Sequence, residues 1–274
     1  MTSVVIAAHN EAAVIGDTLR SLLAGAAPGT LDVTVAANGC TDDTAQVAAS
    51  FPGVRVVELP VASKPAALNA ADAVAVGFPR VYLDADIQVT AASVATVVAA
   101  LDTHLAAAPR RELELSGRPL LVRAYYAIHS RLPALRTGLF GRGMVAVSEA
   151  GRARFDRFPD LVADDLFLDS QFSEDEKCVV AEAASRVATP RRTWDLIRRL
   201  VRVRAGNAAL RARGAGIRAA DRFSWLRDVV VPRPWLAGAA ACYVAITLIA
   251  AVLARRRSVA DSWGRDESSR IGAS

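Results

Sequence analysis

The sequence has few cysteines and almost no lysine. Its three cysteines, Cys40, Cys178 and Cys242, are odd in number and far apart, without a CxxC pair or a cysteine–histidine cluster. This spacing disfavours both a disulfide framework and a zinc site, and it is typical of a protein in a reducing compartment. The first residues also lack the basic start and the apolar run of a signal peptide. We therefore expect the bulk of the protein to lie in the cytoplasm.

Several catalytic motifs are missing as well. There is no GxSxG, HExxH or Walker A string, so nothing supports an α/β-hydrolase, a zinc protease or a P-loop enzyme. Residues 8–16 also lack the Gly-rich phosphate loop that would open a sugar-nucleotide nucleotidyltransferase.

The charges are unevenly distributed along the chain. Residues 1–109 contain 4 basic and 10 acidic residues, whereas the remainder contains 29 basic and 18 acidic residues. Lys64 and Lys177 are the lysines, and the segment 186–227 carries twelve arginines against two acidic residues. An acidic front half is suited to a metal ion, and a basic back half to phosphate or anionic lipid.

The first 110 residues alternate between apolar runs and helical patterns. Strands are expected at Ser3–Ala8, Leu31–Ala37, Val54–Leu59 and Val81–Leu83, with helices between them and at about 91–105. Thr41 is expected to cap the second helix, with Asp42 and Asp43 in its first turn. This order predicts an α/β fold with a mostly parallel central sheet and helices on both faces.

The alternation ends near residue 110. Glu112–Ser116 and Pro119–Arg123 are predicted to form a hairpin around Gly117. Further on, we expect a strand at Met144–Val147 and a helix at Leu161–Phe172.

Near the C-terminus, Pro234–Ala254 contains 21 residues without a charge, between Arg233 and the run 255–257. At about 1.5 Å per residue, a helix of this length spans roughly 30 Å, the thickness of a bilayer's hydrocarbon. Trp235 stands at its start, as an interfacial anchor would. The segment predicts membrane association, and its alternative is a helix buried against protein.

These patterns divide the chain into four parts. Residues 1–110 form a first half. Residues 111–230 form a second half that includes the basic segment 186–227. Residues 234–254 form the hydrophobic helix, and residues 258–274 a polar tail.

Polar side chains follow the expected strands where each one ends. His9 and Glu11 follow the first strand, Asn38 the second and Asp84 the fourth, and Lys64 lies in the connection after the third. Ligands of parallel sheets bind at the carboxyl ends of the strands, so four separate segments contribute to one expected site.

Two acids two residues apart end the fourth strand. Asp84 and Asp86 offer carboxylate oxygens, the ligands that Mg²⁺ and Mn²⁺ prefer, and these ions keep positions for substrate phosphates. The alternative is a simple turn with helix-capping acids.

Four strings in this order resemble the family 2 glycosyltransferases, which have a GT-A fold: IAAHNE at 6–11, VAANGCTDDT at 35–44, SKPAALN at 63–69 and YLDAD at 82–86. The resemblance covers residues 1 to about 110 and continues more loosely to about 207. It implies that residues 1–110 form a nucleotide-sugar-binding half and residues 111–230 an acceptor-side half. It implies that a sugar moves from a nucleotide-diphosphate donor, most plausibly a UDP-sugar, to an acceptor hydroxyl. It also implies inversion at the anomeric carbon and a requirement for Mg²⁺ or Mn²⁺.

The resemblance assigns roles to residues of the first half. Ala8, His9 and Glu11 line the base and ribose pocket, and Lys64 lies near the nucleotide. Asn38 stands where the family commonly has an aspartate that meets the base. Asp84 contacts the sugar or ribose, and Asp86 holds the metal ion.

By the same resemblance, the catalytic base is one of two adjacent acids, with Asp165 preferred to Asp164. An acceptor hydroxyl has a pKa far above neutrality, so a carboxylate must take its proton. The family's arginine motif near the end of the catalytic domain is absent as a string. Arg199 and Arg202 occupy the corresponding place and are expected to contact the diphosphate.

We therefore expect an inverting, metal-assisted glycosyltransferase at the cytoplasmic face of the cell membrane, with a hydroxyl acceptor that could be lipid-linked. One rival is a non-catalytic nucleotide-binding scaffold with the same fold. Another is an RNA-binding protein that uses the arginines of 186–227, but few aromatic residues, Trp194 and Phe223 among them, lie between these arginines, and nucleic acid is not expected as a partner.

Overall fold

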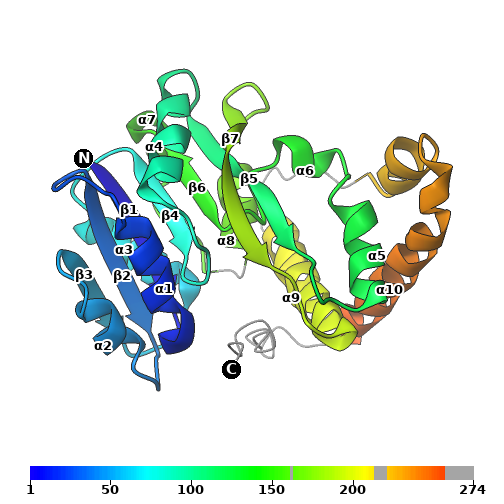
Figure 1. Ribbon diagram of the computed structural model, residues 1–274, viewed down its shortest axis with the longest axis horizontal. Helices are drawn as coiled ribbons and strands as arrows, with labels where there is room; N and C mark the ends of the chain where they lie inside the picture. The colour runs from blue at the N-terminus through cyan, green and yellow to red at the C-terminus, as the bar shows by residue number, and fades with distance from the viewer. Residues whose placement is uncertain (161–162, 213–220, 257–274) are drawn as a thin grey trace. The chain divides into compact units, whose positions relative to one another are not determined.

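The computed structural model describes residues 1–160, 163–212 and 221–256, and it separates into two compact units (Figure 1). The first unit comprises Met1–Glu112 and Leu139–Val187. The second comprises Leu113–Gly138 and the described residues from Ala188 onward. The expected tail at 258–274 lies outside the described residues.

The first unit is built on a seven-stranded sheet with the order β3-β2-β1-β4-β6-β5-β7. Pairs β1–β2, β1–β4 and β2–β3 are parallel, whereas β6 runs antiparallel to both β4 and β5. The expected mostly parallel sheet is therefore confirmed. The strands are β1 (Thr2–Ala8), β2 (Leu31–Asn38), β3 (Val54–Leu59), β4 (Arg80–Asp84), β5 (Ala106–Glu114), β6 (Met144–Val147) and β7 (Lys177–Ala188).

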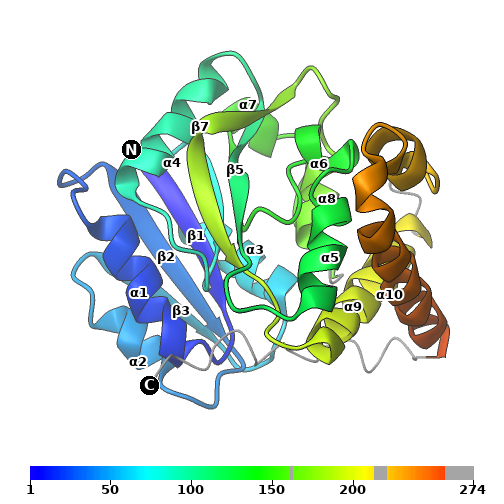
Figure 2. The ribbon, with the colours of Figure 1, turned by 45° about the vertical axis from the view of Figure 1, so that its right-hand side comes forward.

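Helices cover both faces of this sheet, as expected (Figures 1 and 2). Helices α1 (Ala12–Leu23) and α2 (Thr44–Ala49) follow crossovers from β1 toward β3 and therefore lie on one face, where α4 (Ala91–Ala99) packs beside α1. Helix α3 (Lys64–Val74) belongs to the crossover in the opposite direction, from β3 to β4, and right-handed connections place it on the other face.

The core explains this layering. The central strands β1 and β2 are almost continuously apolar and buried, including Val4, Ile6 and Val35, because both of their faces are covered. Helix α1 buries Leu19 and Leu22 on one side and leaves its polar residues on the other. The strand order changes direction between β1 and β4, which places a topological switch point at the carboxyl ends of these two strands.

The antiparallel part of the sheet corrects two expectations. The predicted hairpin at Glu112–Ser116 and Pro119–Arg123 is wrong, because β5 ends at Glu114 and Gly117, with φ +66°, turns the chain into a helix. Within the expected second hairpin strand, Val122 is instead buried in a cluster with Tyr125 and Tyr126 of the following helix. Strand β7 was not predicted, and with β6 it assigns residues 139–187 to the first unit, across the expected boundaries of 111–230.

The helix after β2 also begins later than expected. Thr41 does not cap it, because α2 starts at Thr44 and a carboxylate oxygen of Asp42 accepts the Thr44 N–H at 3.2 Å. Asp42 and Asp43 precede this helix rather than lying in its first turn. By contrast, Thr90 caps α4 as expected, since its hydroxyl accepts the Ser93 N–H at 3.1 Å.

Two short helices in the first unit precede β7: α7 (Glu149–Arg152) and α8 (Asp164–Asp169). Only residues 163–172 of the helix expected at Leu161–Phe172 are described, and its regular part is α8.

The second unit is helical. It contains α5 (Leu120–His129), α6 (Ala134–Thr137), α9 (Thr193–Ala212) and α10 (Ala237–Arg256), with a π-helical turn at Trp225–Val230 and a 3₁₀ turn at Pro234–Leu236. Helix α10 packs along α5 and α9 (Figure 2). Among the described residues, Pro234–Arg255 is long and apolar enough to cross a membrane, with a mean hydropathy of 2.3.

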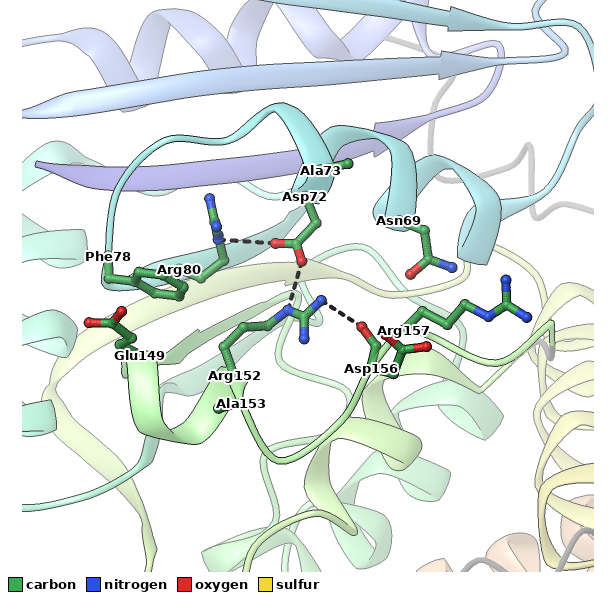
Figure 3. Close-up of a pocket in the computed structure, with 10 residues that line it drawn as sticks. All are labelled: Asn69, Asp72, Ala73, Phe78, Arg80, Glu149, Arg152, Ala153, Asp156 and Arg157. Atoms are coloured by element: carbon green, nitrogen blue, oxygen red, sulfur yellow. Dashed lines mark hydrogen bonds and ion pairs between the residues drawn. The ribbon is translucent and has the colours of Figure 1, made fainter.

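A buried ion cluster lies at the amino end of β4, opposite to the strand ends described below (Figure 3). The Asp72 carboxylate lies 3.0 Å from Arg80 Nε and 2.7 Å from Arg152 Nε, and the Tyr82 hydroxyl donates to it at 3.1 Å. Arg152 also donates to the carbonyl oxygens of Phe155 and Asp156, so it ties the segment after α7 to α3. The cluster borders a pocket of about 470 Å³ that none of the expected site residues lines.

We predict that Asp72→Ala lowers the free energy of unfolding by about 3–5 kcal/mol, because the buried Arg80 and the half-buried Arg152 would lose their counter-charge. Urea denaturation followed by circular dichroism measures this loss. Asp43→Ala is the matched control, since Asp43 is exposed and its side chain makes no capping bond, and it should change stability by less than about 0.5 kcal/mol. Equal effects of the two substitutions would contradict the structural role of the cluster.

Candidate active site

The carboxyl ends of β1, β2 and β4 meet at one edge of the sheet. Ala8 pairs with Ala37 across β1 and β2, and Ala7 pairs with Asp84 across β1 and β4. The residues that follow these pairs are therefore neighbours, which brings His9, Asn38 and Asp84 to the same edge, as expected.

Asn38 holds two connections of this edge together. Its side-chain NH₂ donates to the Ala8 carbonyl oxygen at 2.7 Å, and its Oδ1 accepts the Ser63 N–H at 3.0 Å. The residue is 1% exposed. Its amide is thus engaged within the protein, and contact with a base edge would require these hydrogen bonds to be exchanged.

The turn after Asn38 requires glycine. Gly39 has φ +56°, and a Cβ there would lie 2.5 Å from the backbone nitrogen of Ala62. The chain after β3 therefore approaches the end of β2 closely, and this approach directs the next segment, which carries Lys64, toward the site.

His9 and Glu11 line the connection after β1. The Nδ1 atom of His9 lies 2.6 Å from the Asn38 carbonyl oxygen, which can only accept, so Nδ1 is the donor of this hydrogen bond. The Glu11 N–H donates to the Thr44 hydroxyl at 2.7 Å, and the Glu11 side chain is buried. The structure places these residues together with the buried Ala8, and their assignment to the base and ribose pocket stays a prediction.

Lys64 joins the end of β4 to the acidic pair. Its Nζ lies 2.7 Å from an oxygen of Asp84 and 2.8 Å from an oxygen of Asp164. The ammonium reaches both because α3 starts at this residue, where Ser63 caps the helix and Pro65 occupies its first turn. Three segments far apart in the sequence thus meet at one cation.

Asp165 is held by the loop before β6. One oxygen accepts the Gly141 N–H at 2.8 Å, and the other accepts the N–H of Leu166 at 2.8 Å. The carbonyl oxygen of Gly143 in the same loop accepts the Asp84 N–H at 2.8 Å. The loop therefore links the end of β4 to the start of α8.

Burial and a neighbouring carboxylate raise the pKa of Asp165 to about 6. Burial of the carboxyl is the largest cause, and the nearby Asp164 carboxylate adds to it. Lys64 and the Gly141 N–H act in the opposite direction. The pKa of Lys64 is itself well above its usual value, because the attraction of Asp164 and Asp84 outweighs the effect of burial. At neutral pH, Lys64 is thus a fixed cation and Asp165 a carboxylate close to its titration point.

Sequence reasoning missed the residues that support this loop. Asp169, one helical turn after Asp165, accepts the Leu139 N–H at 2.8 Å and pairs with the buried Lys177 at 2.9 Å. Arg142 is buried and donates to the Pro109 carbonyl oxygen at 3.1 Å. Burial and the nearby Arg111 lower the pKa of Arg142 to about 10. The one signal for these residues in the sequence was the rarity of lysine, which singles out Lys177 but does not indicate which residue it pairs with.

Asp84 and Asp86 flank the buried Ala85 in a turn that the Ile87 N–H closes on the Asp84 carbonyl oxygen at 3.2 Å. Among the described residues, no group of three or more metal-ligating side chains is present. Two hard carboxylates still fit an ion such as Mg²⁺ or Mn²⁺, which takes few protein ligands and fills its remaining positions with water and substrate phosphates.

The two expected phosphate ligands lie in the second unit. Arg199 and Arg202 are both on α9, and Arg199 Nη1 donates to the Ala188 carbonyl oxygen at 3.4 Å. Their role toward the diphosphate stays a prediction.

Comparison with known families identifies the first part of the chain. Residues 3–138 match the sequence model of Glycosyl transferase family 2, which confirms the resemblance found in the sequence. A comparison with curated proteins gave no match.

Solved structures of glycosyltransferases share the fold. A mannosyltransferase from Pyrobaculum calidifontis, solved with GDP-Man and Mn²⁺, is 23% identical with a TM-score of 0.61, covering 93% of this chain and 78% of its own. Glucosyl-3-phosphoglycerate synthase from Mycobacterium tuberculosis, solved with Mn²⁺, UDP and glucosyl-3-phosphoglycerate, is 22% identical with a TM-score of 0.57, covering 80% and 81%. S. aureus TarS, solved with UDP, is 15% identical with a TM-score of 0.53, covering 94% and 92%. These similarities confirm the GT-A-like fold.

We predict that Lys64→Met raises the pKa of Asp165 above its value of about 6, because it removes the cation that stabilises the carboxylate. Lys64→Arg keeps the charge and should change the pKa of Asp165 less. Carbon-13 NMR titration of the aspartate carboxyl groups measures both shifts. A pKa that is unchanged in Lys64→Met would contradict the electrostatic role of the ammonium.

Proposed function

We propose that this chain, which carries a Glycosyl transferase family 2 region at residues 3–138, transfers a sugar from a nucleotide-diphosphate donor to an acceptor hydroxyl with inversion. The observation that carries the proposal is the Lys64 bridge between Asp84 at the end of β4 and Asp164 on α8. This bridge holds the expected donor-side carboxylate and the expected base in one cluster. A non-catalytic scaffold would have no need for a carboxyl group close to its titration point in that cluster.

Asp165 is the general base of the proposed reaction. Asp164 is paired with the Lys64 ammonium at 2.8 Å, which occupies one of its oxygens. Asp165 accepts only backbone N–H groups, so each of its oxygens retains a lone pair, and its pKa of about 6 makes it a stronger base than an ordinary aspartate.

The proposed reaction is one displacement. Asp165 takes the proton of the acceptor hydroxyl, the acceptor oxygen forms a bond to the anomeric carbon, and the bond from that carbon to the diphosphate oxygen breaks. The nucleophile enters on the face opposite to the leaving group, so a single displacement inverts the configuration.

The leaving diphosphate gains negative charge as this bond breaks. Asp86, with Asp84 beside it, would hold a Mg²⁺ or Mn²⁺ ion, which supplies positive charge for the diphosphate when bound. Within the chain, Arg199 and Arg202 are proposed to supply guanidinium groups for the same charge. Ala8, His9, Glu11 and Asn38 are proposed to form the nucleotide pocket, with Lys64 at its border.

The ligands of similar structures and the apolar C-terminal stretch support the proposed substrates. A UDP-sugar is the proposed donor, and the solved structures named above contain UDP or GDP-Man, which supports a nucleoside diphosphate. We propose a hydroxyl acceptor on a lipid or cell-envelope glycan precursor at the cytoplasmic face of the membrane. The apolar stretch Pro234–Arg255 supports this location.

Asp165→Asn tests the proposed base. We expect kcat/KM for sugar transfer to fall about 1000-fold, because the amide cannot accept the proton. The parent enzyme should lose activity as the pH falls below about 6, since protonated Asp165 is inactive, and the pH dependence of kcat/KM measures this limb.

Asp102→Asn is the matched control, an exposed carboxylate outside the cluster that should leave kcat/KM unchanged. A parent protein without transfer or donor hydrolysis for any nucleotide sugar would overturn the proposed function. Full activity of Asp165→Asn would instead move the base to another residue.

Asp86→Ala tests the proposed metal ligand. In the parent protein, Mn²⁺ should increase the thermal stabilisation that a UDP-sugar provides, because the ion and the diphosphate bind together. In Asp86→Ala, we expect this Mn²⁺-dependent increase in Tm to disappear while the fold is retained. An equal Mn²⁺ effect in both proteins would exclude Asp86 as the ligand.

A further inference from the structure

Helix α10 has one face packed against protein. Ile246 and Ala250 are buried in a cluster with residues of α5 and α9 in the second unit. Near the start of the helix, Tyr243 stacks on Tyr125 at 5.2 Å, and Ala240 packs with Ile128. The two helices α5 and α10 therefore run antiparallel, side by side, as Figure 2 also shows.

The opposite face of α10 is exposed and apolar. It is formed by residues spaced alternately three and four apart, which recur on one side of a helix. These residues are Gly238, Ala241, Ala245, Leu248 and Val252. Leu248 is 59% exposed, and no polar side chain interrupts the stripe before Arg255, which continues it. We call this stripe, with the adjacent Ile249, the exposed face of α10.

Neighbouring segments extend this apolar surface. The π-helical turn packs on the first part of α10 through Trp225 and Val229. Around it, Phe223, Val231 and Trp235 are all at least two-thirds exposed. Of the 15 exposed large apolar side chains in the described residues, 11 lie in the second unit. Such a concentration is unusual for a surface in contact with water alone and indicates an interaction site.

The same unit is strongly basic. Residues 113–138 and 188–256 contain 18 arginines and four acidic residues. Within the part of the chain that the structure describes, Arg222, Arg233 and Arg255 have no acidic partner. Arg233 precedes the apolar stretch and Arg255 ends the exposed face. Apolar side chains between arginines fit a surface that is apolar inside and negatively charged outside, which is the chemistry of an anionic bilayer.

The packing of α10 indicates whether the helix crosses this bilayer or lies parallel to its surface. If α10 crossed the hydrocarbon, α9 packed along it would enter too. Helix α9 carries Asp195 and five arginines, at positions 198, 199, 202, 204 and 211. Charged side chains at that depth are strongly unfavourable. A helix parallel to the membrane plane keeps its exposed face in the acyl boundary while the arginines reach the headgroups.

We propose that the second unit is a monotopic membrane-binding module, in which the exposed face of α10 and the adjacent apolar turn lie in the interfacial layer of an anionic bilayer without crossing it. The inference rests on the membrane association within the proposed function and adds its mode. It does not depend on sugar transfer.

Vesicle flotation of the full-length protein tests binding. We expect the protein to float with phosphatidylcholine vesicles that contain one third phosphatidylglycerol, and much less with phosphatidylcholine alone. The double substitution Leu248→Gln and Val252→Gln should lower vesicle partitioning roughly tenfold or more, because two exposed apolar side chains lose their burial in lipid. High salt should weaken binding by screening the arginines.

Val61→Gln with Val76→Gln is the matched control. These valines are similarly exposed but lie in the first unit, and their replacement should leave flotation unchanged. Circular dichroism and the thermal shift caused by UDP-sugars test whether each variant is folded. The inference would be overturned if Leu248→Gln/Val252→Gln floated as well as the control variant, or if the parent protein did not float. Either result would count even where UDP-sugar binding persists. Conversely, flotation without nucleotide-sugar binding would leave the inference intact and refute the proposed donor.

A second measurement separates lying from spanning. Single cysteines at positions 241, 245 and 252, in a background with the native cysteines replaced by serine, carry a fluorescent label that brominated lipids quench. An interfacial helix predicts the same shallow depth for all three labels, whereas a span predicts the deepest label at 245. The spanning pattern would overturn the proposal. A dimer would also overturn the proposal if sedimentation showed that it forms in a concentration-dependent way, is lost in Leu248→Gln/Val252→Gln and does not bind vesicles.

Discussion

The ammonium group of Lys64 between two carboxylates is the interaction on which the candidate active site depends. It lies within 2.8 Å of both Asp84 and Asp164, and without it the acids at the end of β4 and the start of α8 would repel each other in a partly buried place. Local signals position this cation, since the Ser63 cap and Pro65 start α3 at this residue. A short helix start thus connects the parallel part of the sheet to the acidic helix.

The backbone of the loop before β6 holds the remaining acidic residues of the site in place. Asp165 and Asp169, one turn apart on α8, accept the N–H groups of Gly141 and Leu139, while the Gly143 carbonyl accepts the N–H of Asp84. Gly143 has φ +72°, and a Cβ there would collide with the Ile87 side chain, so only glycine allows this approach. The buried Lys177 neutralises Asp169. Asp165 lacks such a direct cationic partner, which is one reason that its pKa rises while Asp169 serves as a structural anchor.

The sequence predicted the parallel half of the fold well, because its strands are buried on both faces and read as apolar runs between helical patterns. The prediction failed where polar contacts between distant residues determine the structure. Gly117 was interpreted as a hairpin turn followed by a strand at Pro119–Arg123, although Val122 shares the buried face of α5 with Tyr125 and Tyr126. Strand β7 was not predicted, because Glu182, Ser185 and Arg186 interrupt its short apolar runs. The site residues were found through their position at strand ends and through motif resemblance, but Lys177 and Arg142 act through partners that no local pattern indicates.

The charges of the two units are balanced in different ways. The first is acidic at its strand ends and places its own cation, Lys64, among the carboxylates. The second has too few acidic residues to neutralise its arginines, because two of its four acids, Asp221 and Asp228, pair with the same residue, Arg227. Its excess positive charge therefore has to be balanced from outside the chain, while its apolar residues remain exposed beside it. Both conditions are met by a partner with an anionic surface and an apolar interior, whereas a polyanion such as RNA meets only the first.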